Sequence, residues 1–293
     1  FTNQELEYLR TKDTLKMCID PDWMPFEQID SNGRYRGMAA DILELVKQRT
    51  KINLTALKTK TWTESIEFAK TRQCDMYSLA MATPERKQYM DFTKPYVSFP
   101  FVIATRNEEL FINNIEQVID KPLAIVSGYA YSEILKKSYP AIKLVEVKNI
   151  LEGLKMVQDK TVYGFIDALP TVAYNIQKQG MANIKIAGKF DYFWELAIGT
   201  RNDEPILNRI MQKALRSVSE KEKVDIYNHW YMVRYEKGVD YQLIWQILII
   251  ATILLLIIFY WNRQLSNAKE QTQKALNDLK ILHLVALVQA LII

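Results

Sequence analysis

An uncharged apolar run near the C-terminus constrains this chain more than any other feature. Residues 241–261 include no acidic or basic side chain. At ~1.5 Å per helical residue such a run spans about 31 Å, the thickness of a bilayer core. Aromatic residues stand at both ends, as they do where membrane helices meet water: Tyr241, Trp245, Tyr260 and Trp261. We therefore predict a transmembrane helix over residues 241–261.

Basic residues flank this run on both sides, so the positive-inside rule does not decide its orientation. Lys221, Lys223, Arg234 and Lys237 precede the run, and Arg263, Lys269, Lys274 and Lys280 follow it. The chain begins at Phe1 and carries no recognisable signal peptide, so we expect a fragment or a processed product.

The composition argues against several classes of function. The chain has 293 residues, 49% hydrophobic and 25% charged, which suits about two globular domains. Its net charge of +4 is scattered, so we expect no nucleic-acid partner. With two histidines, His229 and His283, and two cysteines, Cys18 and Cys74, we expect no metal site, no His-based triad and no cofactor. The cysteines could form one disulfide, but both fall at predicted strand positions, where we expect buried free thiols.

Strands and helices alternate through the rest of the chain. Residues 1–13 are polar and helix-prone, and we interpret them as a leader or linker. Apolar patterns predict strands at 15–19, 52–57, 76–81, 99–104, 123–126, 142–147 and 162–166, extended chain at 191–199, and helices after Gly37, from Trp62, at 130–137 and 150–158, from Pro170 and at 204–218. This order indicates an α/β fold with a mostly parallel sheet and helices on both faces.

A short internal echo indicates how these elements are divided. The run Ile103–Glu108 (Ile-Ala-Thr-Arg-Asn-Glu) returns as Ile198–Asp203 (Ile-Gly-Thr-Arg-Asn-Asp). Two matched extended segments that bracket an α/β unit fit two lobes joined by paired crossovers. We therefore predict a two-lobed domain over residues 14–237, with the second lobe inserted into the first: lobe 1 at about 14–104 and 200–237, lobe 2 at about 105–199.

The sequence of the stretch Asp75–Arg86 indicates a binding site for an anionic group. Its Met76–Met81 part is predicted to be a buried strand, and Thr83 and Pro84 suit the N-cap and first position of a helix. Free backbone N–H groups at such a turn, with the forked cation of Arg86 in the first turn, suit a carboxylate or a phosphate. The alternative is a surface helix with a solvated Arg86.

Beyond the apolar run, residues 262–293 have a helical pattern. Residues at alternating spacings of three and four form a heptad seam: Leu265, Ala268, Thr272, Ala275, Leu279, Leu282, Ala286 and Gln289. The seam predicts a coiled coil, and with it a homodimer, while a plain amphipathic helix is the alternative. We expect this segment to be cytoplasmic and truncated.

A set of short motifs runs through the first third of the chain: Asp20-Pro21-Asp22-Trp23-Met24-Pro25-Phe26-Glu27, Gly33 with Gly37-Met38, Trp62, Thr83-Pro84-Glu85-Arg86, and Asp91-Phe92-Thr93 with Pro95-Tyr96. In this order they resemble the family 3 periplasmic solute-binding proteins, the Venus-flytrap binders of polar amino acids, over about Leu15–Tyr231. The leader and the C-terminal anchor are more similar to the form of this domain in membrane sensors, chiefly sensor histidine kinases and diguanylate cyclases. The resemblance implies a periplasmic-binding-protein type II fold.

The resemblance also implies a site for a small carboxylate-bearing solute, and a polar amino acid is the class of solute that it leads us to expect. Arg86 would hold the ligand carboxylate, with Ser78 and backbone groups near Met81 and Thr83 as further contacts. In lobe 2, Tyr129 sits at a Gly-x turn that often contacts the carboxylate in this family.

Other positions would bind the rest of the ligand. Trp23 and Trp62 match aromatic positions that sandwich its side chain or face its ammonium, and Asp20 matches a position that often reads the side chain. Many members carry an Asp for the α-ammonium one residue after Asp167, where this chain has Ala168. Asp167 could serve through a small shift, or the ligand lacks an α-amino group. Alternatively, the two tryptophans are core aromatics and Asp167 is a helix N-cap.

Three functions compete on this scaffold. The resemblance and the membrane helix favour a single-pass sensor in the inner membrane, whose binding domain lies in the periplasm or outside the cell and signals by hinge closure. A transport-type amino-acid-binding protein is normally free or lipid-anchored, so the C-terminal helix argues against it. An enzyme on the same scaffold is the third candidate. A dehydratase would need a general acid or base in the cleft, for which Glu27 or Asp167 could serve, whereas related lytic transglycosylases keep their catalytic Glu in an extra domain. No paired constellation is present, so we expect no catalysis. A glutamate-receptor-type channel would need pore helices between the lobes, and the sequence has none there.

Overall fold

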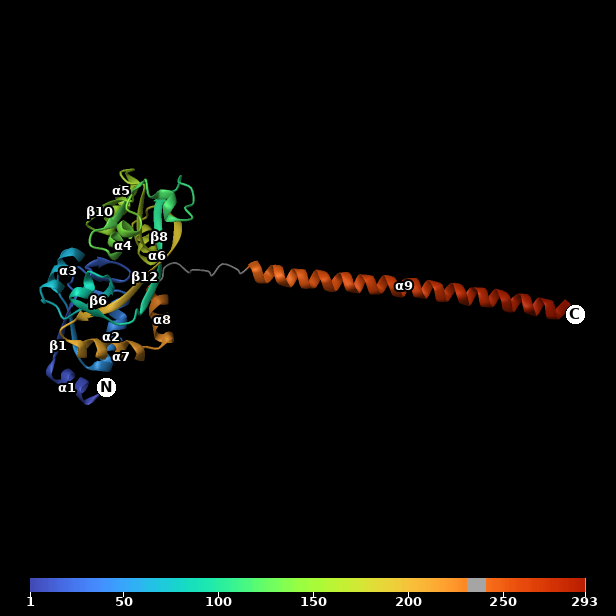
Figure 1. Cartoon of the computed structure of the whole chain (residues 1–293), viewed down its shortest axis with the longest axis horizontal. Helices are drawn as coiled ribbons and strands as arrows, with labels where there is room; N and C mark the ends of the chain where they lie inside the picture. Colours follow the sequence, from blue (N-terminus) through green and yellow to red (C-terminus); the bar gives the residue numbers. More distant parts are fainter. Residues whose placement is uncertain (231–240, 293) are drawn as a thin grey trace. The chain divides into compact units, whose positions relative to one another are not determined.

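The computed structural model describes residues 1–230 and 241–292. The described residues fall into two compact units, residues 1–230 and the single helix α9 (Tyr241–Ile292) (Figure 1). Residues 231–237, which we assigned to lobe 1, lie outside the described residues, as does Ile293.

The predicted membrane helix and the predicted helical extension belong to one continuous helix, α9. Within it, Trp245–Lys274 is apolar and long enough to cross a membrane, by length and composition. The side chains of several predicted heptad positions lie outside the described residues: Ala275, Leu282, Ala286 and Gln289.

One sheet runs through residues 1–230. Within the described residues, its nine strands lie in the order β10–β9–β11–β8–β12–β6–β1–β5, with β7 beside β12. The strands are β1 (Thr14–Cys18), β5 (Asn53–Ala56), β6 (Met76–Met81), β7 (Met90–Phe92), β8 (Val97–Arg106), β9 (Pro122–Val126), β10 (Lys143–Val147), β11 (Gly164–Ala168) and β12 (Ile184–Arg201). A small second sheet contains β2 (Asp22–Trp23), β3 (Glu27–Ile29) and β4 (Tyr35–Arg36).

Helices cover this sheet, which confirms the predicted α/β fold. They are α1 (Asn3–Thr11), α2 (Met38–Thr50), α3 (Trp62–Lys70), α4 (Ala130–Ser138), α5 (Ile150–Gln158), α6 (Leu169–Lys178), α7 (Pro205–Ser217) and α8 (Glu220–Trp230). Capping residues set some of the predicted starts: Thr61 accepts a hydrogen bond from Glu64 N (3.2 Å) before α3, and Asn149 accepts one from Glu152 N (2.9 Å) before α5.

The strands β8 and β12 join two halves of the sheet. They pair antiparallel; β9, β10 and β11 lie beyond β8, and β6, β1 and β5 lie beyond β12 (Figure 1). We call the half with β1, β5 and β6 lobe 1 and the half with β9, β10 and β11 lobe 2. Pairing is parallel between β1 and its neighbours and between β9 and its neighbours. The predicted parallel sheet is therefore correct at both ends and wrong at the centre.

The echo segments mark opposite ends of this crossover. Ile103 to Arg106 lies opposite Ile184 to Gly188 at the lobe 2 end, whereas Gly199 to Arg201 pairs with β7 in lobe 1. The strands β8 and β12 run between the two halves of the sheet, and the echo segments do not pair with each other.

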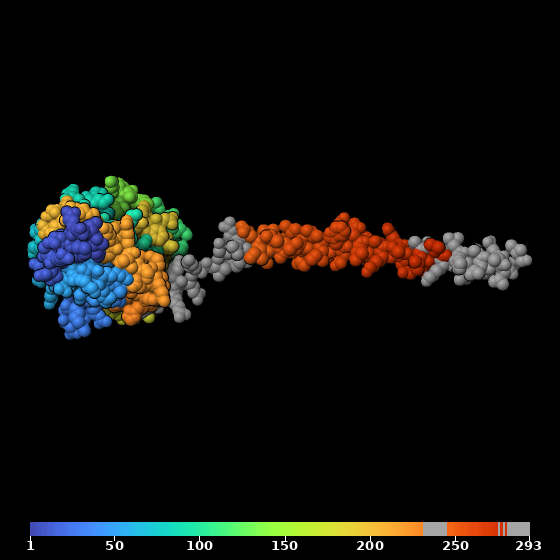
Figure 2. All heavy atoms as spheres, turned by 90° about the horizontal axis from the view of Figure 1, so that it is seen from below, coloured from blue at the N-terminus to red at the C-terminus, as the bar shows by residue number. Residues whose placement is uncertain are grey.

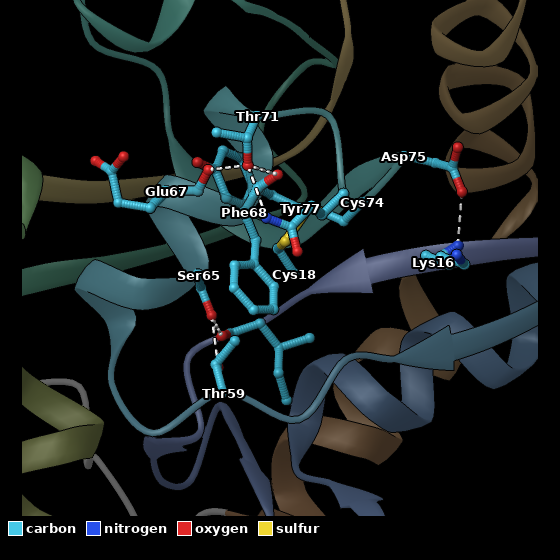
Figure 3. Close-up of a disulfide and its surroundings, with 12 residues drawn as sticks. Lys16, Cys18, Thr59, Ser65, Glu67, Phe68, Thr71, Cys74, Asp75 and Tyr77 are labelled. Atoms are coloured by element: carbon cyan, nitrogen blue, oxygen red, sulfur yellow. Dashed lines mark hydrogen bonds between the residues drawn. A yellow bond between two sulfur atoms is a disulfide. The ribbon is translucent and has the colours of Figure 1, made fainter.

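Cys18 and Cys74 form a disulfide (Figure 3), so the prediction of free thiols is wrong. Because β1 and β6 are neighbours in the sheet, the two Cα atoms lie 5.8 Å apart, which a disulfide can bridge. Asp20 follows Cys18 closely, and the strand that ends at Met81 follows Cys74. The bond therefore ties together two segments of lobe 1 that lead to the candidate site.

The turn after β6 is not the α-helix that Thr83 and Pro84 predict. A single 3-10 turn, η1 (Arg86–Gln88), stands there instead. Thr83 Oγ1 still accepts a hydrogen bond from Arg86 N (3.3 Å). The turn is short because Met90 already pairs with β12 as the start of β7.

The predicted leader contains helix α1, which packs on lobe 1. Thr2 and Glu5 form a capping box at its start, and the buried Glu5 pairs with Lys213 of α7 (2.7 Å). Figure 2 shows this dark blue segment on a face that also carries the orange helices of the same unit. The N-terminal segment is thus a folded part of lobe 1.

Candidate solute-binding site

A small cavity lies between the two lobes. Its lining residues come from both: Asp20, Trp23, Trp62, Leu79, Ala80, Met81, Arg86, Tyr129, Ala130, Trp194 and Leu196. Its volume is about 10 Å³, which is room for a single water molecule. A wider groove of about 370 Å³ lies next to it, and Arg86, Tyr129 and Ala130 line both spaces. The protein's own side chains therefore fill the inner part of the cleft.

Arg86 joins the two lobes at this cavity. It is 6% exposed, and its Nη1 donates to Met81 O (2.8 Å) while its Nη2 donates to Gly128 O (2.9 Å). Its guanidinium carbon lies 5.2 Å from the centre of the Trp62 ring, in cation–π range. Burial lowers the pKa of Arg86 from its usual value. Among the described residues its hydrogen-bond acceptors are carbonyl oxygens, which carry no full negative charge.

Gly128 is the point where lobe 2 meets these side chains. Its carbonyl oxygen also accepts a hydrogen bond from Trp62 Nε1 (3.1 Å). Its φ of +77° lies in the left-handed region that favours glycine, and a Cβ would lie 3.0 Å from Ile66 Cδ1 and 3.4 Å from Trp62 Cδ1. A glycine at this turn lets the backbone approach Arg86 and Trp62 closely.

Aromatic rings and Asp20 form the other end of the cavity. The Tyr129 ring centre lies 5.3 Å from that of Trp23 and 5.5 Å from that of Trp194. All three side chains are buried. The Tyr129 hydroxyl crosses between the lobes and donates to Asp20 Oδ2 (2.9 Å), while Asp22 N donates to Asp20 Oδ1 (3.0 Å).

Two buried carboxyl groups of lobe 1, those of Asp20 and Glu27, form no ion pair with any residue that the structure describes. Desolvation raises the pKa of Asp20 to about 6 and that of Glu27 to about 8. Glu27 accepts hydrogen bonds from Asp20 N (2.9 Å), the Tyr35 hydroxyl (2.8 Å) and the Ser78 hydroxyl. Glu27 is fully buried and supports the Asp20 backbone without lining the cavity.

The structure brings most of the predicted site residues together, but not all. Asp20, Trp23, Trp62, Met81, Arg86 and Tyr129 line the inner cavity, and Thr83 lines the adjacent groove. Ser78 is fully buried and lines neither space; its hydroxyl bonds to Glu27.

Asp167 is also fully buried away from the cavity lining. Its Oδ1 accepts a hydrogen bond from Ala168 N (2.6 Å), and its carboxyl group also interacts with the Trp23 side chain of lobe 1. Burial raises its pKa well above the usual value. The N-cap of α6 is Ala168, so the alternative of Asp167 as a helix cap is wrong.

Trp194 is a lining residue that the sequence analysis missed. It lies on β12, the strand predicted only as extended chain at 191–199. Side chains there alternate between exposed Phe193 and Glu195 and buried Trp194 and Leu196. That alternation is visible in the sequence, and it would have placed Trp194 on the inner face.

Comparisons with known proteins extend over this whole region. Residues 15–233, about three quarters of the chain, match the bacterial extracellular solute-binding proteins, family 3. The chain belongs to this family. It is a family of binding and sensing domains rather than of enzymes.

The chain is similar to the virulence sensor protein BvgS of Bordetella bronchiseptica, with 25% identity over 289 residues that cover 95% of this chain and 23% of BvgS. The crystal structure of the periplasmic VFT2 domain of Bordetella pertussis BvgS has the same fold, with a TM-score of 0.72 and 23% identity over 79% of this chain and 99% of that domain. An ancestral arginine-binding protein bound to arginine gives a TM-score of 0.67 and 20% identity, over 75% of this chain and 99% of that one. The chain thus spans about a quarter of BvgS, and these relatives support a periplasmic sensing domain.

Proposed function

We propose that this chain is the sensing part of a membrane receptor that binds a small carboxylate-bearing solute between its lobes. The buried guanidinium of Arg86 carries the proposal, because its bonds at the lobe junction go to two carbonyl oxygens. A buried cation without an anionic partner is costly. A ligand carboxylate would accept two parallel hydrogen bonds from the same guanidinium.

A polar amino acid is the proposed class of solute. The Asp20 carboxyl group accepts a hydrogen bond from Tyr129, whereas Arg86 donates to Gly128. In place of Tyr129, a ligand could donate a hydrogen bond to Asp20. The rings of Trp23 and Trp62 line the same cavity and suit a flat or cationic group. The fold shared with an arginine-binding protein supports this class.

In this proposal, residues 1–230 lie in the periplasm or outside the cell, and α9 is the single pass through the inner membrane. The periplasmic relatives and the apolar segment Trp245–Lys274 support that arrangement. Solute would favour the closed lobes, and signalling then requires a difference in affinity between the open and closed states.

A transport-type amino-acid-binding protein is the second candidate. The similarity to an arginine-binding protein favours it, whereas the long apolar helix α9 favours the receptor.

Thermal unfolding of the full chain in detergent micelles tests the proposal. A panel of amino acids and small organic acids is screened, with unfolding followed by tryptophan fluorescence. A bound solute at ~100 times its Kd should add about 2.7 kcal/mol of stability. Arg86→Ala should remove this gain, because the loss of a partner in a desolvated ion pair costs roughly 3–5 kcal/mol.

Lys87→Ala is the matched control, since Lys87 is the exposed neighbour of Arg86 in the same turn. It should keep the full stabilisation. Equal stabilisation of the Arg86→Ala variant and of the parent chain would refute the role of Arg86.

A further inference from the structure

The segment Gly128–Tyr129 of lobe 2 meets the lobe 1 groups that the proposed ligand would use. The Gly128 carbonyl oxygen accepts from both Arg86 Nη2 (2.9 Å) and Trp62 Nε1 (3.1 Å). A ligand carboxylate oxygen would need these same donors. The backbone of lobe 2 therefore stands where an anionic acceptor would stand.

The Tyr129 side chain continues this pattern toward Asp20. Its ring packs against Trp23 and Trp194, with centres 5.3 and 5.5 Å away, and its hydroxyl donates to Asp20 Oδ2 (2.9 Å). The side chain is 5% exposed. One residue thus supplies an apolar ring and a hydrogen-bond donor at the positions where a ligand body and its polar end would lie.

The small size of the inner cavity shows that the Tyr129 side chain and its neighbours leave little space between the lobes there. With Tyr129 in its wall, the inner cavity measures about 10 Å³, and an amino acid is many times larger than the one water that fits there. A solute can reach Asp20, Trp23 and Arg86 together only if Tyr129 leaves or the lobes separate.

We propose that Tyr129 is a built-in occupant of the solute site and determines which solutes bind. This inference rests on the proposed function and names the residue with which the solute competes. The site then selects solutes that replace all three contacts: an acceptor oxygen for Arg86 and Trp62, a flat body between the rings, and a donor for Asp20. Conformers in which Tyr129 occupies the site reduce the apparent affinity by the fraction of binding-competent molecules.

Three variants of the full chain in detergent micelles test this inference. Tyr129→Ala removes the ring and the hydroxyl, and Tyr129→Phe removes the hydroxyl alone. Tyr139→Ala is the control, because Tyr139 ends α4 outside the cavity and bonds to Glu116 and Tyr192. The first probe is p-cresol, the free form of the tyrosine side chain, followed by tryptophan fluorescence and thermal shift. The second is L-arginine, together with any solute found in the screen.

If Tyr129 is the occupant, p-cresol binds Tyr129→Ala and neither the parent chain nor Tyr139→Ala. Any solute that binds the parent chain should bind Tyr129→Ala at least tenfold more tightly and Tyr129→Phe severalfold more tightly. Tyr139→Ala should keep the parent affinity. Because Tyr129→Phe keeps the ring, it tests the inference even where Tyr129→Ala does not fold.

Other outcomes separate this inference from the proposed function. Weaker solute binding by Tyr129→Ala and Tyr129→Phe would make Tyr129 a ligand contact and overturn the inference while the function stands. A folded Tyr129→Ala that ignores p-cresol would overturn it as well. If p-cresol binds Tyr129→Ala but no carboxylate solute binds any variant, the inference that Tyr129 occupies the site is upheld and the proposed function is refuted.

Discussion

Glu27 lies fully buried in lobe 1, and its pKa of about 8 means that it keeps its proton at neutral pH. In the unfolded chain this carboxyl ionises near its usual value of 4.5. The folded state therefore holds a proton that the unfolded state releases between these two values. The stabilisation is complete below pH ~4.5 and is lost as pH rises through about 8.

Glu27→Gln should remove this part of the pH dependence. For the parent chain, the Glu27 contribution to the free energy of unfolding should fall by about 1 kcal/mol between pH 7 and pH 9. The variant should lose less over that range, because an amide does not ionise. Urea unfolding at several pH values measures the difference. Glu44→Gln, on the surface of α2, should follow the parent chain, and an unchanged profile for Glu27→Gln would contradict the assignment.

Some residues of the site were predictable and others were not, for physical reasons. Arg86, Trp23 and Trp62 stand in sequence motifs, and all three line the cavity. The bond between Gly128 O and Arg86 was not predictable, because it depends on the distance between two lobes. The partners of Glu27 were hidden for the same reason, since Tyr35 and Ser78 come from different strands.

At the scale of elements, α8 connects the crossover strand β8 with the end of the first unit. The Tyr227 hydroxyl donates to Tyr96 O (3.0 Å), next to the start of β8, and the Tyr227 ring lies 5.9 Å from Phe99 on that strand. Near the end of α8, Trp230 Nε1 donates to Asp41 of α2 (2.6 Å). This helix therefore contacts both the crossover and the body of lobe 1.

Tyr227→Phe should loosen α8. The variant loses the hydrogen bond to Tyr96 O, which contributes about 1 kcal/mol, so amide hydrogens of α8 should exchange about fivefold faster. Hydrogen exchange followed by mass spectrometry measures this rate. Tyr174→Phe serves as the control, because Tyr174 lies on α6 in lobe 2. An unchanged rate in α8 would show that the Tyr227 hydroxyl does not hold the helix.

Elements with strong local signals were predicted well. Helix α5 has the predicted bounds, and α3 begins at the predicted Trp62, since each has a side-chain cap before an apolar stripe. The prediction of an α-helix after Thr83 was wrong because the strand pairing of β7 overrides the helix start that Thr83 and Pro84 favour locally. The prediction of free thiols at Cys18 and Cys74 was wrong because the sequence does not reveal that β1 and β6 are neighbours.

At the scale of the whole molecule, the heptad seam in the sequence of α9 predicts that two copies associate. Leu265→Cys, at a seam position, should cross-link between two copies under mild oxidation in membranes. Asn267→Cys should cross-link far less, because two residues further along a helix the side chain points to the other side. Gel mobility without reductant measures the dimer. Equal cross-linking at both positions would argue against a seam along Leu265.

The overall architecture followed from the sequence more fully than the site did. The order of strands and helices and the motifs between residues 20 and 96 led to the family that the match over residues 15–233 shows. The small distance between the lobes could not be predicted from the sequence. It depends, like the cavity volume, on how Tyr129 packs against Trp23.

The Cys18–Cys74 bond links the redox state of these two cysteines to the compartment in which the first unit folds. Disulfides persist in oxidising compartments and are rare in the reducing cytosol. The chain has only these two cysteines, and both are joined to each other. If the first unit is exported as proposed, Cys18 and Cys74 should carry no free thiol in exported molecules and one free thiol each in molecules that remain in the cytosol.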